Sequence, residues 1–180
     1  IPLSILALLS VFGGFLGGPH VFHLLPNNME RAMGSCALLM CVQLLSVEAM
    51  PKDKLDARAE NCVELADMAY EADVDPLIVI AIAHTESRFS KTAVSSAGAR
   101  GIMQILPKYF CPKKGKCDYT EAGFKAWRAW SKGRSYEEAL CRYNSGRSCK
   151  NSARAKVYSN SVMRKYLRLI ELSRSEHCIT

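Results

Sequence analysis

The segment from Pro76 to Pro107 constrains the fold of this chain more than any other part of the sequence. Residues 77–83 are uniformly apolar, and they follow Asp75 and Pro76, which are favoured at the N-cap and in the first turn of a helix. Periodicity alone does not separate helix from strand in such a run, but the Asp-Pro start and the length up to Glu86 favour a helix. Because this helix is apolar on every side, we expect it to be buried.

Glu86 comes at the C-terminal end of this predicted helix. Burial and the negative end of the helix dipole both disfavour a charged carboxylate, so we expect the pKa of Glu86 to be raised. A carboxyl group that is still protonated near neutral pH can act as a general acid. In the loop that follows, Gly98 and Gly101 permit a tight turn or a close approach of the backbone to a ligand.

Three motifs, which occur in order and cover roughly residues 60–170, resemble the soluble lytic transglycosylase family. The matching residues are Glu86-Ser87-Arg88-Phe89, Ala93-Val94-Ser95, Gly98 to Gln104 with Pro107, Ala139 to Gly146, and Tyr158 with Val162. The departures are mild, since Ile102 replaces a usual Leu and Arg142 replaces a usual small residue. A single Glu-Ser-x-Phe would be weak, but three motifs at fitting distances are specific.

The resemblance implies a mainly α-helical, lysozyme-like domain, and the absence of alternating strand patterns agrees with it. It implies a peptidoglycan lytic transglycosylase, which cleaves the β-1,4 bond between N-acetylmuramic acid and N-acetylglucosamine and leaves a 1,6-anhydro end. By this resemblance Glu86 is the single general acid and base. The muramic 6-hydroxyl attacks intramolecularly, so no second carboxylate is needed to activate water. Peptidoglycan glycan strands are the expected partner, and neither a cofactor nor a metal is expected.

The resemblance also carries over a set of substrate-binding residues. They are Ser95, Met103, Gln104, Tyr143, Asn144 and Tyr158. In this set Asn144 is expected to hold the segment of Tyr143, and Tyr158 is expected to face Glu86 from the last helix. From the residues alone, plain core packing explains Met103 and Tyr158 as well as a place in the cleft does.

Two rival functions remain open from the sequence. The first is a lysozyme-type muramidase that hydrolyses the same bond with a second carboxylate and water. The other acids considered for that role are Asp118, Glu121, Glu137 and Glu138. Of these, Glu138 is better explained as the partner of Ser135 in a capping box that opens a helix. The second rival is a non-catalytic wall-binding or assembly module, against which the presence of Glu86 argues.

The sequence divides into three parts. Residues 1–28 begin with an uncharged apolar stretch, which is either a membrane span or sequence upstream of the real start; four glycines and the lack of flanking positive charge weaken the first reading. Residues 29–49 are typical of a secretory signal, with Arg31, an apolar run and a small-residue cleavage site. Residues 50–180 form the catalytic domain. We therefore expect an exported protein, periplasmic or extracellular, with membrane association through the N-terminal segment as an alternative.

The cysteines support export. Cys36 and Cys41 lie in the predicted signal and would be removed with it. The six that remain are Cys62, Cys111, Cys117, Cys141, Cys149 and Cys178. An even count after an export signal predicts disulfides, and proximity along the chain favours Cys111–Cys117 and Cys141–Cys149, which leaves Cys62–Cys178. A buried free thiol remains an alternative for at least one of them, while a zinc site is disfavoured because no C-x-x-C occurs.

The formal net charge is +7, from 24 Lys and Arg against 17 Asp and Glu. The positive residues are scattered and form no dense basic run, so we expect no nucleic-acid partner. A basic surface fits the anionic cell wall. Whether the protein serves a secretion machine, a conjugation machine, a phage or general wall turnover is not fixed by the sequence.

Overall fold

The computed structural model describes residues 27–113 and 115–175 of the chain. Its elements are α2 (Asn27–Leu45), α3 (Lys52–Glu71), α4 (Pro76–Ser87), α5 (Pro107–Phe110), α6 (Tyr119–Ser131), α7 (Tyr136–Ser145), the 3-10 helix η1 (Cys149–Asn151) and α8 (Ala153–Ser175). Within the described residues, β-pairing is limited to two isolated bridges in the loop of residues 94–105. The prediction of a mainly α-helical domain is therefore confirmed.

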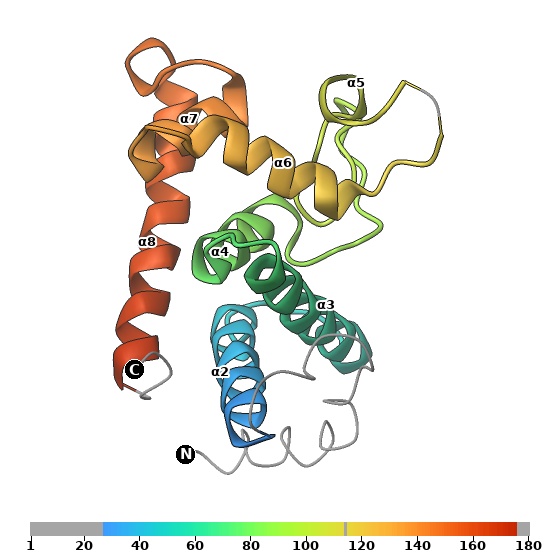
Figure 1. The fold of residues 1–180 in the computed structure, drawn as a ribbon, viewed down its shortest axis with the longest axis vertical. Coiled ribbons are helices and arrows are strands. Elements are labelled where there is room, and N and C mark those ends of the chain that lie inside the picture. Colours follow the sequence, from blue (N-terminus) through green and yellow to red (C-terminus); the bar gives the residue numbers. More distant parts are fainter. Residues whose placement is uncertain (1–26, 114, 176–180) are drawn as a thin grey trace.

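Helix α4 is the central element of the fold, packed against α3 and α8 (Figure 1). All its residues from Leu77 to His84 are buried. As predicted, Asp75 caps the helix, with its side chain accepting a hydrogen bond from the Leu77 backbone N–H. The same carboxylate accepts a hydrogen bond of 2.7 Å from the hydroxyl of Tyr166 on α8. The start of the buried helix is thus tied to the last helix.

Helix α2 packs against α3 and α8 (Figure 1). Its side chains Leu38, Met40, Cys41, Leu44 and Leu45 belong to the hydrophobic core. The prediction that export removes residues 29–49 concerns processing and stays a prediction. Residues 1–26 of the apolar N-terminal segment lie outside the described residues, and no described helix has the length and apolar character needed to cross a membrane.

The predicted pairing of Cys62 with Cys178 is wrong, because Cys62 is bonded to Cys41 of α2. The packing of α2 on α3 brings the two Cα atoms to 5.9 Å, a normal disulfide separation. Cys36 is also disulfide-bonded, and Cys178 lies outside the described residues. The sequence analysis missed this disulfide because it assigned Cys41 to the predicted signal segment, residues 29–49, which export would remove.

The two local disulfides are confirmed. Cys111 bonds to Cys117 between α5 and α6, and Cys141 of α7 bonds to Cys149 of η1. Short sequence separations of 6 and 8 residues made these pairings readable from the chain. Each closes a small surface loop next to a helix.

Helix α7 begins as the sequence predicts. Ser135 accepts a hydrogen bond from the Glu138 backbone N–H, and Gly146 ends the helix in the left-handed conformation at φ 70°. The carboxylate of Glu138, however, does not complete a capping box. It accepts hydrogen bonds from Arg142 and from the Ser148 hydroxyl and Cys149 backbone N–H, so it anchors the segment that follows the helix.

Candidate active site

Glu86 lies in the last turn of α4 and is partly exposed. The hydroxyl of Tyr158, from α8, donates a hydrogen bond of 2.7 Å to its Oε1 atom. Burial raises the pKa of Glu86 to about 7, and the Tyr158 hydrogen bond opposes this rise. At neutral pH both protonation states are therefore populated, so this carboxyl can donate a proton and then accept one.

The chain turns sharply just after Glu86. Arg88 and Phe89 have positive φ values of 49° and 61°, a conformation that side-chain-bearing residues rarely adopt and that costs of order 1–3 kcal/mol each. The turn is held by its surroundings: the Phe89 side chain is fully buried, and Asn61 of α3 donates a hydrogen bond of 2.9 Å to the Phe89 carbonyl. Arg58, also on α3, donates to the Ser87 carbonyl. The orientation of Glu86 is thus set by α3 as well as by α4.

Ser87 joins this turn to the loop that faces it. Its hydroxyl donates a hydrogen bond of 2.7 Å to the Ile102 carbonyl and accepts one from the Ser90 backbone N–H. In the sequence, Ser87 was identified only as part of the Glu-Ser-x-Phe motif, and no role was predicted for it. Its place directly after Glu86 is the signal that could have identified it.

Ser95 and Gln104 hold the loop of residues 93–105 in shape. The Ser95 hydroxyl accepts a hydrogen bond from the Ala99 backbone N–H. The Gln104 side chain donates to the carbonyls of Ala93 and Gly101, although Gln104 itself has a positive φ of 51°. Both predicted site residues therefore shape the loop; their contact with sugar is untested and stays a proposal.

Gly101 is required by space as well as by backbone conformation. Its φ is +78°, and a Cβ atom at this position would lie 2.7 Å from the Cβ atom of Tyr119 in α6. Any side chain here would push the loop away from α6. The tight turn expected at Gly101 is confirmed, and the close neighbour of its backbone is α6; the approach of this backbone to a ligand stays a prediction.

Tyr143 and Met103 form a second contact between the loop and the helices. The Tyr143 hydroxyl donates a hydrogen bond of 2.8 Å to the Met103 carbonyl. Burial, and then the charge of Glu86, raise the pKa of Tyr143 well above its usual value, so it stays a neutral donor. The Met103 side chain is fully buried, so it belongs to the core rather than to an open surface.

The structure brings Glu86, Tyr143 and Tyr158 into one electrostatic group, since the charge of Glu86 raises the pKa of both tyrosines after burial has done so. Asn144 does not join them. It is exposed at the end of α7, and its side chain makes no hydrogen bond to the described residues, so its role in holding the Tyr143 segment stays a prediction. The predicted facing of Tyr158 toward Glu86 agrees with the geometry.

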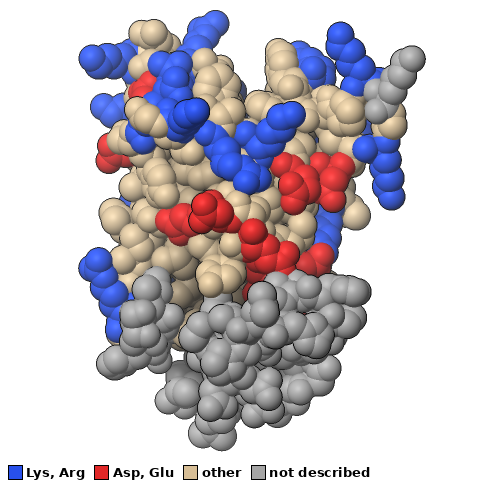
Figure 2. Space-filling view, in the orientation of Figure 1, with Lys and Arg blue, Asp and Glu red and all other residues tan. Residues whose placement is uncertain are grey.

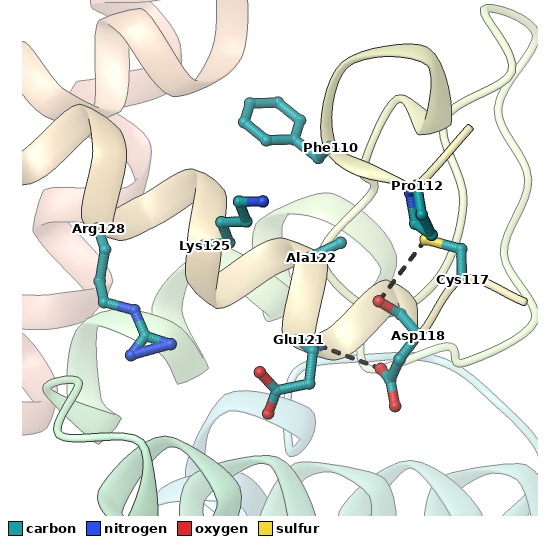
Figure 3. Close-up of a pocket in the computed structure, with 8 residues that line it drawn as sticks. All are labelled: Phe110, Pro112, Cys117, Asp118, Glu121, Ala122, Lys125 and Arg128. Atoms are coloured by element: carbon teal, nitrogen blue, oxygen red, sulfur yellow. Dashed lines mark hydrogen bonds between the residues drawn. The ribbon is translucent and has the colours of Figure 1, made fainter. Parts of the chain in front are cut away.

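The other acids considered from the sequence have different settings. Asp118 caps α6 by accepting hydrogen bonds from the backbone N–H groups of Thr120 and Glu121. Figure 3 shows Asp118 and Glu121 at one side of an open pocket between α5 and α6, which neither Glu86 nor a tyrosine lines. Glu137 is exposed on α7. Among the described residues, no carboxylate contributes to the shifted pKa of Glu86.

The fold and the site together define a class of protein. It is a helical domain that carries one acid, Glu86, between a buried helix and a loop held by hydrogen bonds to its backbone. A family model described as the transglycosylase SLT domain matches residues 65–164, more than half of the chain. The chain belongs to this family. Neither the comparison with curated proteins nor that with solved structures gave a match. Family membership confirms the resemblance and the lysozyme-like helical fold, and it supports an enzyme of the lytic transglycosylase type with peptidoglycan as substrate.

A Tyr158→Phe variant should shift the pH dependence of the reaction. The Tyr158 hydrogen bond stabilises the ionised carboxylate, so its loss should raise the pKa of Glu86 further. The alkaline limb of the kcat/KM profile, where the acid loses its proton, is therefore expected to move to higher pH. Turnover against pH on soluble glycan fragments measures this, with Tyr70→Phe, an exposed tyrosine on α3, as the control. An unmoved limb would show that Tyr158 does not act on the acid.

Proposed function

We propose that this protein is a peptidoglycan lytic transglycosylase that cleaves the MurNAc-β-1,4-GlcNAc bond and leaves a 1,6-anhydro-muramyl end, with Glu86 as the only general acid and base. The observation that carries the proposal is the setting of Glu86. Burial raises the pKa of Glu86 to about 7, and the Tyr158 hydroxyl donates a hydrogen bond of 2.7 Å to its carboxyl group.

In the first step the Glu86 carboxyl donates its proton to the glycosidic oxygen as the bond from that oxygen to the muramic C1 breaks. The carboxylate that results keeps the hydrogen bond from Tyr158, which favours the charged form. In the second step the muramic 6-hydroxyl oxygen bonds to C1, and the Glu86 carboxylate takes the hydroxyl proton. The proton balance closes on Glu86, and no water is consumed.

An intramolecular nucleophile suits a site with a single acid. A hydroxyl of the same sugar reaches effective concentrations far above those of a free reactant, so no second carboxylate is needed to orient it. An inverting hydrolase would place a second carboxylate roughly 6.5–9.5 Å from the acid, and a retaining one about 5–5.5 Å away. Of the other acids considered, Asp118 caps α6, and Glu138 pairs with Arg142 and anchors the segment after α7, so both already have structural roles.

The rest of the molecule fits an exported wall enzyme. The disulfides Cys41–Cys62, Cys111–Cys117 and Cys141–Cys149 are typical of an oxidising compartment. Figure 2 shows Lys and Arg spread over the upper part of one face, above a band of Asp and Glu. The net positive charge favours approach to an anionic wall. We therefore propose a periplasmic or extracellular location.

The product of digestion tests this function. We expect mass spectrometry of the fragments released from purified peptidoglycan to show anhydro-muramyl ends, each lighter than a reducing end by one water. The Glu86→Gln variant should release neither kind, while the matched Glu121→Gln variant, altered in the pocket beside α6, should behave as wild type. Predominantly reducing ends would contradict the mechanism and would identify a muramidase on the same fold.

A further inference from the structure

A polar junction lies where the chain leaves α2. It consists of three residues. Glu48 follows the end of α2 by three positions, His84 lies in α4, and Arg88 lies in the turn that follows α4. The Oε2 atom of Glu48 is 2.7 Å from the Nε atom of Arg88, and its Oε1 atom is 3.4 Å from the Nε2 atom of His84. His84 and Arg88 stand two residues before and two residues after Glu86. Glu48 therefore bridges the segment that presents the acid.

Within this junction the negative charge of Glu48 is neutralised by the ion pair with Arg88. The pKa of His84 is lowered by burial first and by the nearby positive charge of Lys165 second, so His84 is neutral at pH 7. The charge of Glu48 and a hydrogen bond to the Leu44 backbone oppose this lowering. Lys165 of α8 donates instead to the Thr85 hydroxyl, at 3.1 Å. The side chain of Glu48 is 18% exposed while that of Arg88 is 62% exposed, so solvent reaches the pair from the Arg88 side and weakens its electrostatic part.

Arg88 occupies a strained backbone position, so the ion pair with Glu48 helps to hold that conformation. It caps α4 in the left-handed conformation at φ 49°, where a residue other than glycine is disfavoured. Such a turn persists only when its surroundings hold it. The turn begins two residues after Glu86, so a relaxation there would move the end of α4 that carries the carboxyl.

The element that supplies Glu48 is rigidly attached. Helix α2 is bonded to α3 through the disulfide Cys41–Cys62, and both sulfur-bearing residues are fully buried. The backbone N–H of Glu48 donates to the Leu45 carbonyl, which continues the helix into the turn. Glu48 therefore reaches the junction from a fixed support, outside the residues 65–164 that match the family model.

We propose that Glu48 is a positioning residue for Glu86, and that helix α2 with the turn after it is a working part of the enzyme. Glu48 holds the Arg88 turn in its left-handed form, and this turn sets the direction of the Glu86 carboxyl. The inference rests on the proposed function of Glu86. It is the alternative to the expected cleavage after residue 49, which would remove Glu48 from the mature protein.

The first test is the intact mass of the exported protein purified from its cell compartment. We expect a chain that retains Glu48, with the Cys41–Cys62 disulfide recovered in a non-reducing peptide digest. A mature chain that begins after residue 49 would overturn the inference. It would leave the proposed reaction untouched, because Glu86 and its tyrosine partners lie beyond that point.

The second test is kinetic, on soluble glycan fragments with the full chain. Glu48→Ala should lower kcat by about tenfold with KM unchanged, because a misdirected acid slows chemistry without weakening sugar binding. The double variant Glu48→Ala/Arg88→Ala should lose no more than Glu48→Ala does, since the two residues act as one unit. The matched control is Glu60→Ala, an exposed glutamate of α3 with no ion pair to a described residue.

The outcomes separate this inference from the proposed function. A kcat for Glu48→Ala equal to that of Glu60→Ala, or independent and additive losses in the double variant, would overturn the positioning role alone, provided that Glu86→Gln is inactive. A lower melting temperature with unchanged kcat would show a purely structural role and would also overturn it. An active Glu86→Gln variant would instead defeat the proposed function, whatever Glu48→Ala does.

Discussion

The Glu86→Gln variant is expected to lose peptidoglycan cleavage by about 10²–10⁴-fold while keeping its fold. Glutamine preserves the size of the side chain and can still accept the Tyr158 hydrogen bond, but it has no proton to deliver. Both steps of the proposed reaction pass through this one carboxyl, so no neighbouring acid among the described residues can compensate. Clearing of a purified peptidoglycan suspension measures the loss, and circular dichroism reports the helical fold.

The matched control is Glu121→Gln, the same substitution on α6 at the pocket shown in Figure 3. It should leave the clearing rate within about twofold of wild type, as expected for a surface change away from the reacting group. A folded Glu86→Gln variant that clears peptidoglycan at a near wild-type rate would reject Glu86 as the catalyst.

The second large effect concerns stability against pH. The pKa of Glu86 is about 7 in the folded protein against 4.5 for an unperturbed glutamate, so between these values the folded state binds more protons than the unfolded state. The free energy of unfolding must then fall as pH rises through this window, and the loss persists above it. Below about pH 4.5 the group is protonated in both states and contributes nothing.

Glu86→Gln removes this penalty because glutamine does not ionise. The variant should therefore be more stable than wild type by about 2 kcal/mol at pH 8, a value reduced for the exposed fraction of the side chain, and the advantage should vanish near pH 4. Urea unfolding followed by circular dichroism across this range gives the difference directly. A difference that does not change with pH would mean that the folded and unfolded pKa values are the same.

Local patterns were enough to predict the framework of the site. Asp75 and Pro76 marked the start of the buried helix, and its apolar run predicted both the burial and the raised pKa of Glu86. Ser135 marked the start of α7 in the same way. Each of these features depends on residues within a few positions of one another, and such interactions can be read from the chain.

Features that depend on packing between distant helices were not predicted. The bond between Cys41 and Cys62 exists because α2 packs on α3, a contact that no local pattern encodes. Glu48 was read as part of a cleavage site, although its side chain contacts Arg88 in the structure. The family motif also gave Asn144 a holding role, which stays a prediction because its exposed side chain makes no hydrogen bond to a described residue.

The source of the oxygen at the new muramyl end tests the mechanism most directly. Peptidoglycan is digested in water enriched in the heavy oxygen isotope. The masses of the released fragments are measured by mass spectrometry before the oxygen at the sugar C1 can exchange with water. Attack by the muramic 6-hydroxyl with Glu86 as acid and base predicts anhydro ends that carry no heavy oxygen. One heavy oxygen at each new end would show that water is the nucleophile, and it would contradict the mechanism proposed for Glu86.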